Sequence, residues 1–289
     1  MRIYAICNPT AGHGLGKKTG MQILEALQHK KIDCHLMMTD YPGHASALAQ
    51  QAVQEGAQTV LAIGGDGTAY ETAQGLMGTG VPLGIIPAGT GNDSIKTLGL
   101  PKAPLDALEH ILKGTARETD IGMINGRLFL NEIGTGFDVM ALDYTLKVKR
   151  FCRGILPYFY GVLQALFRFR SMDLTFSIDG GEEIRQKAFV MAVANGGHIG
   201  GGIRIAPNAS VDDGLMDIVV VGHMRRRDLP FRLMGLMQGK ILSFPETKFY
   251  RAKQVTFSVP DMRLNIDGEV ISAKRAEAGI LQGALLIRR

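Results

Sequence analysis

The stretch Thr59 to Thr68, TVLAIGGDGT, indicates how the first part of the chain folds. It begins with a short apolar run and then changes to glycine, glycine, aspartate and glycine. A short apolar run bounded by glycines is typical of a buried strand that ends in a tight turn. The residues that follow, 68–77, are numerous enough for a helix. The stretch therefore predicts a strand, a glycine-rich turn and a helix, in that order.

The same alternation surrounds this stretch. Apolar runs near residues 3–7, 34–39 and 82–89 favour further strands, and residues 17–31 and 44–54 are long enough to cross between parallel strands as helices. A parallel sheet with flanking helices is therefore expected. In such a sheet the ligand site lies outside the carboxyl ends of the strands. Four turns fall there: NPTAGHG at 8–14, the turn at Thr39, GGDGT at 64–68 and PAGTGND at 87–93.

The pattern changes after residue 120. Short β-branched segments such as DLTFSIDG and QVTFSVP alternate with Gly, Asp and Pro turns, which is typical of an antiparallel sandwich. A helical interlude over residues 137–170 interrupts them. We therefore predict an α/β domain over 1–120 and a mostly antiparallel β-sandwich domain over 121–289, with a return of the extreme C-terminus to the first domain left open.

Composition narrows the class of protein. The chain has 289 residues, of which 46% are hydrophobic and 20% charged, so it is neither disordered nor collagen-like. Its net charge of +5 favours anionic partners such as nucleotides and acidic lipid surfaces. Nucleic acid is the least favoured of these, because no basic and aromatic residues interleave along a strand platform.

The three cysteines, Cys7, Cys34 and Cys152, form no CxxC pair, so neither a disulfide framework nor a thiolate zinc site is indicated. The N-terminus lacks the apolar stretch of a secretory signal. The apolar run over 154–167 is shorter than the ~18 to 20 residues that a membrane-spanning helix needs. A cytoplasmic protein without a spanning segment is expected.

The glycine-rich turns suit a phosphate ligand. Three glycines around Asp66 leave room for a bulky anion, and a carboxylate at a strand end can hold Mg²⁺ against phosphate oxygens. The alternative is that Asp66 caps the helix after it. The turn at 87–93 adds Thr90, Asn92 and Asp93, with an Asx turn as the alternative. The turn at 8–14 can bind phosphate through backbone N–H groups, although it matches neither GxGxxG nor a Walker A loop.

Two acidic turns stand out in the second half of the chain. The stretch 206–215, APNASVDDGL, has paired carboxylates that could coordinate a hard cation, or form a solvated acidic turn. The stretch NIDGE, 265–269, has the Asp-Gly pair of a hairpin turn, and its spacing alone favours a structural role.

Five motifs occur in a fixed order: NPTAG, GGDGT with Glu71, PAGTGND, AP-x-A-x-x-DDGL and a late DGE. In this combination the chain resembles the bacterial diacylglycerol kinase family of soluble lipid kinases over essentially its whole length. The resemblance implies a first domain similar to those of NAD kinases and phosphofructokinases, a C-terminal β-sandwich, and ATP with Mg²⁺ in the cleft.

The resemblance also implies site residues. It gives Asp267 as the catalytic base with Glu269 as the neighbouring candidate, and it places Asp66 and Asp93 beside the base. It implies a structural magnesium on Asp213 with the carbonyls of Ser210 and Leu215. The implied nucleotide contacts are Asn8, Pro9, Thr10, Ala11, Gly12, Thr39, Gly65, Asp66, Gly67, Thr68, Glu71 and Thr90. One departure is Tyr70, where the family usually has Asn.

The implied reaction transfers the γ-phosphoryl group of ATP to the hydroxyl of a lipid such as diacylglycerol. A cytoplasmic enzyme of this kind needs peripheral contact with an anionic membrane, and a homodimer is a possible assembly. Two basic and apolar clusters are candidates for that contact: Lys147, Lys149, Arg150 and Arg153 beside residues 155–167, and Arg225, Arg226, Arg227 and Arg232 around Leu229 and Phe231. The alternatives are an NAD kinase and a non-catalytic lipid-binding or nucleotide-binding protein of the same fold.

Overall fold

The structure is a computed structural model that describes residues 1–149 and 156–289. Its contacts divide the chain into two compact units. Unit 1 comprises Met1–Ile121 with Gln282–Arg289, and unit 2 comprises Gly122–Leu281. Two strands, β5 (Ala116–Ile124) and β17 (Ala276–Arg288), have residues in both units. Within the described residues, no helix is both long enough and apolar enough to span a membrane.

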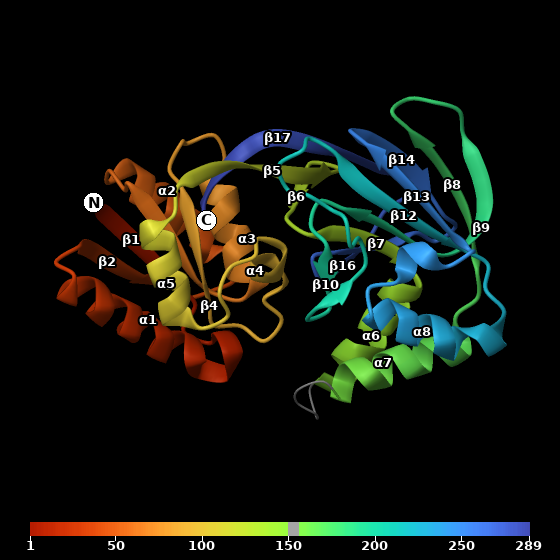
Figure 1. Cartoon of the computed structure of the whole chain (residues 1–289), viewed down its shortest axis with the longest axis horizontal. Helices are drawn as coiled ribbons and strands as arrows, with labels where there is room; N and C mark the ends of the chain where they lie inside the picture. Colours follow the sequence, from red (N-terminus) through yellow and green to blue (C-terminus); the bar gives the residue numbers. More distant parts are fainter. Residues whose placement is uncertain (150–155) are drawn as a thin grey trace. The chain divides into compact units, whose positions relative to one another are not determined.

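Unit 1 is built on a parallel sheet in the order β17, β4, β3, β1, β2 (Figure 1). Its other strands are β1 (Arg2–Cys7), β2 (Asp33–Met38), β3 (Thr59–Gly64) and β4 (Leu83–Pro87). Its helices are α1 (Ala11–His29), α2 (His44–Gln54), α3 (Asp66–Leu76), α4 (Asp93–Thr97) and α5 (Pro104–Lys113).

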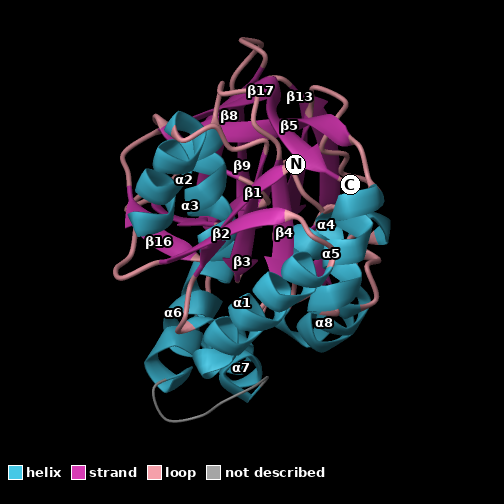
Figure 2. Ribbon diagram, turned by 90° about the vertical axis from the view of Figure 1, so that its left-hand side faces the viewer, coloured by secondary structure: helices cyan, strands magenta, loops and turns pink. Residues whose placement is uncertain are grey.

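Helices cover both faces of this sheet. The apolar side chains of α1 and α5 share one core cluster with alternate residues of the strands, including Ile23, Ile111 and Ile63. Figure 2 shows α2 and α3 on the other side. Every residue of β3 is buried, as expected for a central strand of a parallel sheet.

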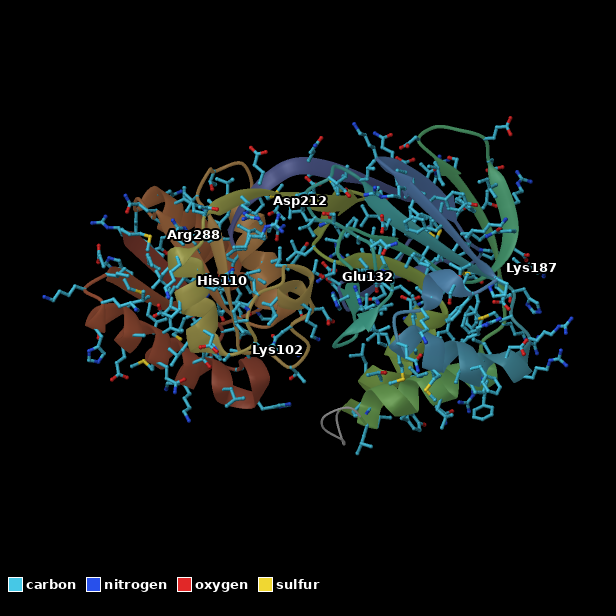
Figure 3. All side chains as sticks on the ribbon, viewed as in Figure 1. Lys102, His110, Glu132, Lys187, Asp212 and Arg288 are labelled. Carbon is cyan, nitrogen blue, oxygen red and sulfur yellow. The ribbon has the colours of Figure 1, made fainter. Side chains whose placement is uncertain are left out.

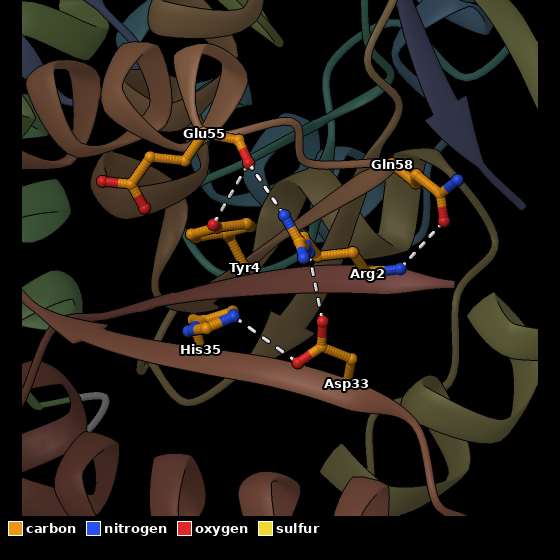
Figure 4. Close-up of polar contacts among 6 residues, drawn as sticks. All are labelled: Arg2, Tyr4, Asp33, His35, Glu55 and Gln58. Atoms are coloured by element: carbon orange, nitrogen blue, oxygen red, sulfur yellow. Dashed lines mark hydrogen bonds and ion pairs between the residues drawn. The ribbon is translucent and has the colours of Figure 1, made fainter.

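A polar network closes the amino-terminal edge of the sheet (Figure 4). The Arg2 guanidinium donates to Asp33 at 3.1 Å and to the Glu55 carbonyl at 3.2 Å, and the backbone N–H of Arg2 donates to the Gln58 amide oxygen at 2.9 Å. His35 lies 3.4 Å from Asp33. These side chains occupy the ends of the strands away from the glycine-rich turns, so the opposite edge is the one that remains for a ligand.

Unit 2 is built mainly of antiparallel strands. The order β16, β15, β7, β9, β8, β14, β17 forms one path, and β12 pairs with both β9 and β13. The strands are β6 (Arg127–Phe129), β7 (Glu132–Gly136), β8 (Met172–Ile178), β9 (Ile184–Ala194), β10 (His198–Ile199), β11 (Ile203–Arg204), β12 (Met216–Gly222), β13 (Thr247–Ala252), β14 (Gln254–Ser258), β15 (Arg263–Ile266) and β16 (Glu269–Ser272).

Three α-helices belong to the described part of unit 2: α6 (Phe137–Lys149), α7 (Leu156–Arg168) and α8 (Leu229–Met237). The apolar faces of β7, β8, β9, β12, β14 and β15 enclose a core that includes Phe129, Phe176 and Leu264. The predicted architecture, a parallel α/β part followed by antiparallel strands with a helical interlude, is confirmed.

Candidate functional site

Three glycine-containing loops of unit 1 meet at the carboxyl ends of β1, β3 and β4. A Cβ atom built on Gly12 would lie 2.2 Å from the carbonyl oxygen of Ala88, and one built on Gly89 would lie 2.4 Å from the Cα of Gly65. Neither clearance leaves room for a side chain. The glycines at these two positions are therefore required for the loops to pack against one another.

Asp66 joins two of these loops. It is the first residue of α3, and its Oδ1 accepts a hydrogen bond of 2.8 Å from the backbone N–H of Ser94 in α4. The alternative role as a cap of its own helix is wrong, because α3 has no side-chain cap of this kind. The second oxygen, Oδ2, faces Gly91, where a Cβ would lie 3.1 Å away.

Asp93 lies in the same loop pair and is buried. Its Oδ1 is 3.0 Å from the ammonium of Lys96, which also donates to the carbonyl of Gly91 at 2.8 Å. Asn92, with a φ of 51°, exchanges hydrogen bonds with the backbone of Gly89 three residues before it, whereas an Asx turn would use the N–H two residues after it. The loop is thus a closed turn that carries the Asp93 carboxylate, and the hydrogen bond from Ser94 to Asp66 links it to the second carboxylate.

The remaining predicted nucleotide residues occupy the same edge of unit 1. Asn8 accepts hydrogen bonds from the backbone N–H and hydroxyl of Thr10, and the N–H of Thr39 donates to the Cys7 carbonyl at 2.9 Å. Thr90 and Gly67 are exposed, and Thr68 is buried. Pro9 lies in the first turn, and Ala11 is the first residue of α1. Glu71 differs from these residues, because its carboxylate accepts a hydrogen bond from the N–H of Ala45 at the start of α2 and so links α3 to α2.

In unit 2, Asp267 lies in the two-residue turn between β15 and β16 with a φ of 46°. Its carboxylate accepts three backbone N–H groups: Leu130 at 2.6 Å, Asn131 at 3.0 Å and Glu132 at 2.9 Å. Such donors stabilise the anion and fix its orientation. Glu269, by comparison, is exposed and lies 3.6 Å from Arg127.

The segment that holds Asp267 is itself held by Asn195. The N–H groups of Asn195 and Gly196 both donate to the Asn131 carbonyl, and the Asn195 side chain donates to the Leu130 carbonyl at 2.9 Å. The sequence analysis did not single out this stretch, ANGG at the end of a buried strand. The sequence signal that could have identified Asn195 is its position between an apolar run and two glycines.

A second group of polar residues lies beneath the Asp267 turn, and sequence reasoning missed it too. The side-chain amide of Asn265 is 3.4 Å from both Glu132 Oε1 and Asp138 Oδ2, and its oxygen accepts from the N–H of Gly268 at 2.8 Å. Figure 3 shows the Glu132 side chain in unit 2, at the start of β7. Gly134 makes room for Asp138, since a Cβ there would lie 1.9 Å from Asp138 Oδ2.

Burial raises the pKa of Asp138 to about 7. The residue is partly exposed as a whole, but its Oδ1 is shielded from solvent and has no hydrogen-bond partner among the described residues. Hydrogen bonds from Asn265 and from the backbone near Val139 act in the opposite direction and do not offset this desolvation. Asp138 is therefore an acid that can carry a proton near neutral pH.

The predicted structural-metal residues adopt a different arrangement. Asp213 accepts from the N–H of Leu215 at 3.1 Å with Oδ1, and Oδ2 forms an ion pair with Arg251. Arg251 also contacts Asp217 at 3.1 Å, and Ser210 donates its hydroxyl proton to Asp212. No cluster of three metal-ligating His, Cys, Asp or Glu side chains occurs within residues 1–149 and 156–289. Carboxylate oxygens are ligands that magnesium prefers, but in this structure the Asp213 carboxylate is paired with the guanidinium of Arg251.

Solved structures define the fold class of this chain. A crystal structure of a diacylglycerol kinase from Bacillus anthracis matches with a TM-score of 0.73 at 23% identity, covering 99% of this chain and 96% of that one. An NAD kinase from Archaeoglobus fulgidus, in complex with ATP, matches with a TM-score of 0.56 at 15% identity, covering 100% and 94%. The chain is thus a two-unit protein of the NAD kinase-like fold.

Sequence comparison identifies the family. Residues 2–124 match the diacylglycerol kinase catalytic domain, and residues 131–288 match the YegS C-terminal NAD kinase beta sandwich-like domain. A diacylglycerol kinase of Mycobacterium tuberculosis is 32% identical over 294 residues, covering 100% of this chain and 95% of that protein. One of Bacillus subtilis is 29% identical, covering 93% and 89%. The chain belongs to the diacylglycerol kinase family, and the resemblance drawn from its five motifs is confirmed.

Proposed function

We propose that this protein is an ATP-dependent lipid kinase that phosphorylates the hydroxyl of diacylglycerol or a related lipid alcohol. Membership of the diacylglycerol kinase family supports a kinase. The observation that carries the finer proposal is the close packing of the Gly65 and Gly89 loops, joined by the hydrogen bond from Ser94 to Asp66. This packing brings loop backbone and the two acids Asp66 and Asp93 together at the end of the sheet, a surface suited to a polyphosphate with magnesium.

In this proposal the unit 1 loops bind the nucleotide. Backbone N–H groups near Gly12 and Gly65 would bind phosphate oxygens, and the Asn8 and Thr39 turns would contact the remainder of ATP. The Asp66 Oδ2 that faces Gly91, together with Asp93, supplies the hard oxygen donors that magnesium prefers. Magnesium, when bound, neutralises charge on the phosphates during transfer.

Asp267 is the proposed general base. The acceptor O–H bond breaks as the new O–P bond forms, the bond from the γ-phosphorus to ADP breaks, and the proton goes to an Asp267 oxygen. Three N–H donors make this carboxylate a stabilised anion. It is therefore suited to accept the proton late, once the hydroxyl oxygen has become acidic through bonding to phosphorus.

The magnesium proposed at Ser210, Asp213 and Leu215 is a structural ion in this scheme, and no catalytic step involves it. Its binding requires Arg251 to release Asp213, and Asp217 is the contact that Arg251 can retain.

The test of function is incubation with radiolabelled ATP, magnesium and a panel of acceptors: diacylglycerol, phosphatidylglycerol, a sphingoid base, a polyprenol and NAD. Label transfer to one lipid alcohol, lost in Asp66→Ala, supports the proposal and identifies the acceptor. Label transfer to NAD alone would instead support the NAD kinase alternative, and ATP binding without transfer to any acceptor would support a non-catalytic protein.

A further inference from the structure

One face of helix α7 is apolar and exposed. Leu156, Tyr160, Leu163 and Phe167 follow one another at intervals of four, three and four residues, which places them in one stripe along the helix. Phe167 is the most exposed of the four, at 68%. An apolar stripe that faces solvent is unusual, because helices ordinarily direct this face toward the core.

The opposite face of α7 is the one that packs on the protein. Gly161 and Ala165 are buried, and a Cβ on Gly161 would lie 2.1 Å from the hydroxyl of Thr145 in α6. This close approach fixes the rotation of α7 about its axis. The exposed stripe therefore cannot turn inward without separating the two helices.

Helix α8 repeats the arrangement. Phe231, Met234 and Met237 recur every three residues and are exposed, Phe231 at 78%. Leu229 is buried in the core, and Gly235 lies against the ring of Phe244, where a Cβ would be 2.7 Å from a ring atom. The outward face of α8 thus consists of large apolar side chains without a charge.

The two helices belong to one patch of unit 2. Inner residues of both helices pack into the same apolar cluster: Leu166 of α7 with Phe169 just after it, and Leu229 and Leu236 of α8. Figures 1 and 2 both show α7 and α8 as neighbours at one end of unit 2. Seven of the fifteen exposed large apolar side chains in residues 1–149 and 156–289 lie on these two helices. We name these seven the α7/α8 face: Leu156, Tyr160, Leu163, Phe167, Phe231, Met234 and Met237.

Exposed arginines lie next to the α7/α8 face in the sequence. Arg168 and Arg170 follow its α7 half, and Arg225 and Arg227 precede its α8 half; all four are exposed, although Arg168 also lies over the Tyr144 ring and Arg227 is 3.8 Å from Asp228. Arg232, one of the residues that the sequence suggested for docking, is not available, because it is paired with Glu246 at 2.9 Å and lies over the Phe244 ring. The suggested side chains of Lys149, Arg150, Arg153 and Arg226 lie outside the described residues.

We propose that the α7/α8 face inserts into the interfacial region of an anionic lipid bilayer, while Arg168, Arg170, Arg225 and Arg227 bind the headgroups. An apolar helix face bordered by cations has the chemistry of an interfacial anchor. A second copy of this chain fits less well, because a symmetric contact would oppose like-charged arginines. The proposal deepens the proposed function, since a lipid alcohol stays in the bilayer, and it identifies where the protein would meet that bilayer.

The sharpest test uses the absence of tryptophan from the sequence. Phe231→Trp introduces a single fluorophore on the α7/α8 face, and Leu105→Trp places one at an exposed position of α5 as the control. With phosphatidylglycerol vesicles, the emission of the Phe231→Trp variant should shift to shorter wavelength and be quenched by brominated acyl chains. The emission of the Leu105→Trp variant should change in neither respect. Equal responses of the two variants, or no response from Phe231→Trp, would overturn the proposal.

Vesicle sedimentation separates the two contributions. Phe167→Ser/Phe231→Ser should weaken binding at least about ten-fold at every salt concentration, because both side chains leave the apolar region. Met21→Ser/Leu105→Ser, on exposed positions of unit 1, is the matched control and should bind like the wild type.

The charge variant completes the set. Arg168→Glu/Arg170→Glu/Arg225→Glu should weaken binding by about two orders of magnitude or more at low salt, since each basic residue near an anionic surface contributes on the order of a ten-fold factor or slightly less. The loss should diminish as salt is added. Unchanged vesicle binding in both the apolar and the charge variants would overturn the proposal. It would also be overturned if the wild type bound no vesicles and the apolar variant changed from dimer to monomer, because the face would then be a contact between two copies of the chain.

These measurements use no ATP, so they succeed or fail independently of the kinase proposal. An acceptor assay adds the connection. The apolar variant should retain turnover of a short-chain diacylglycerol dispersed as monomers and lose turnover of the same lipid in vesicles. A wild type that binds vesicles through this face but phosphorylates no lipid would refute the kinase proposal and leave the docking proposal intact.

Discussion

Replacing Asp138 with Asn should change how the stability of the protein depends on pH. Burial raises the pKa of Asp138 from 3.8 to about 7 in the folded protein, whereas the unfolded chain exposes the carboxyl to water. Between these values the folded protein holds a proton that the unfolded chain releases. The free energy of unfolding should therefore fall as pH rises from about 4 to about 7, and level off above that.

The size of the effect follows from the pKa difference. Each pKa unit corresponds to about 1.4 kcal/mol, so the upper limit for Asp138 is about 4 kcal/mol. The residue keeps some solvent exposure and shares the Asn265 amide with Glu132, so we expect about half of this limit. Asn has nearly the shape of Asp and cannot ionise. Asp138→Asn should accordingly be more stable than the wild type at about pH 8 by about 2 kcal/mol and similar to it at about pH 4.

The measurement is urea unfolding of both proteins from about pH 3 to about pH 8.5, a range that spans both pKa values, with Asp173→Asn as the control. Asp173 is exposed and lies 3.6 Å from Lys187, so this substitution also removes a carboxylate, but one that is solvated (Figure 3 labels Lys187). The control should follow the wild-type curve. Parallel curves for the wild type and Asp138→Asn over this range would refute the reasoning, because they would show that Asp138 ionises equally easily in both states.

Three further predictions concern the proposed chemistry and can be checked with purified protein. Asp267→Asn should lower turnover about a hundred-fold or more while ATP affinity measured by calorimetry stays unchanged; a nearly active Asp267→Asn beside an inactive Glu269→Gln would assign the base to Glu269. Asp66→Ala should weaken magnesium-dependent ATP use by at least about ten-fold in the same assays and lower stability by about 1 to 2 kcal/mol, because it leaves the Ser94 N–H without its acceptor. Asp213→Ala should lower the melting temperature, and the variant should melt at the same temperature in magnesium and in chelator. If the wild type also melts at the same temperature in both conditions, the structural ion is contradicted and the ion pair with Arg251 is the stabilising contact.

The sequence by itself determined the parallel part of the fold. Short apolar runs, glycine turns and helix-length segments are local patterns, and each reports directly on the backbone that it forms. The predicted helix at 44–54 is the observed α2, and the strands predicted near 3–7 and 59–65 match β1 and β3 to within a residue or two. The glycine loops could be placed together for the same reason, since the carboxyl ends of parallel strands share one edge.

Only the tertiary structure decided how side chains far apart in sequence combine. Asp138 and Asn265 are 127 residues apart, and their contact, which helps to bury an acid, leaves no periodic signal in either segment. The same holds for Arg251 and Asp213, which are 38 residues apart and form an ion pair at the proposed cation site.

The helical interlude shows the same division. Periodicity defines the two faces of α7, but only the packing of Gly161 on Thr145 decides which face is covered. In α8 the sequence suggested Leu229 and Phe231 equally for docking, and the structure buries the first and exposes the second. A sequence specifies which side chains can share a face, whereas the free energy of packing against neighbours distant in sequence selects the face that meets solvent.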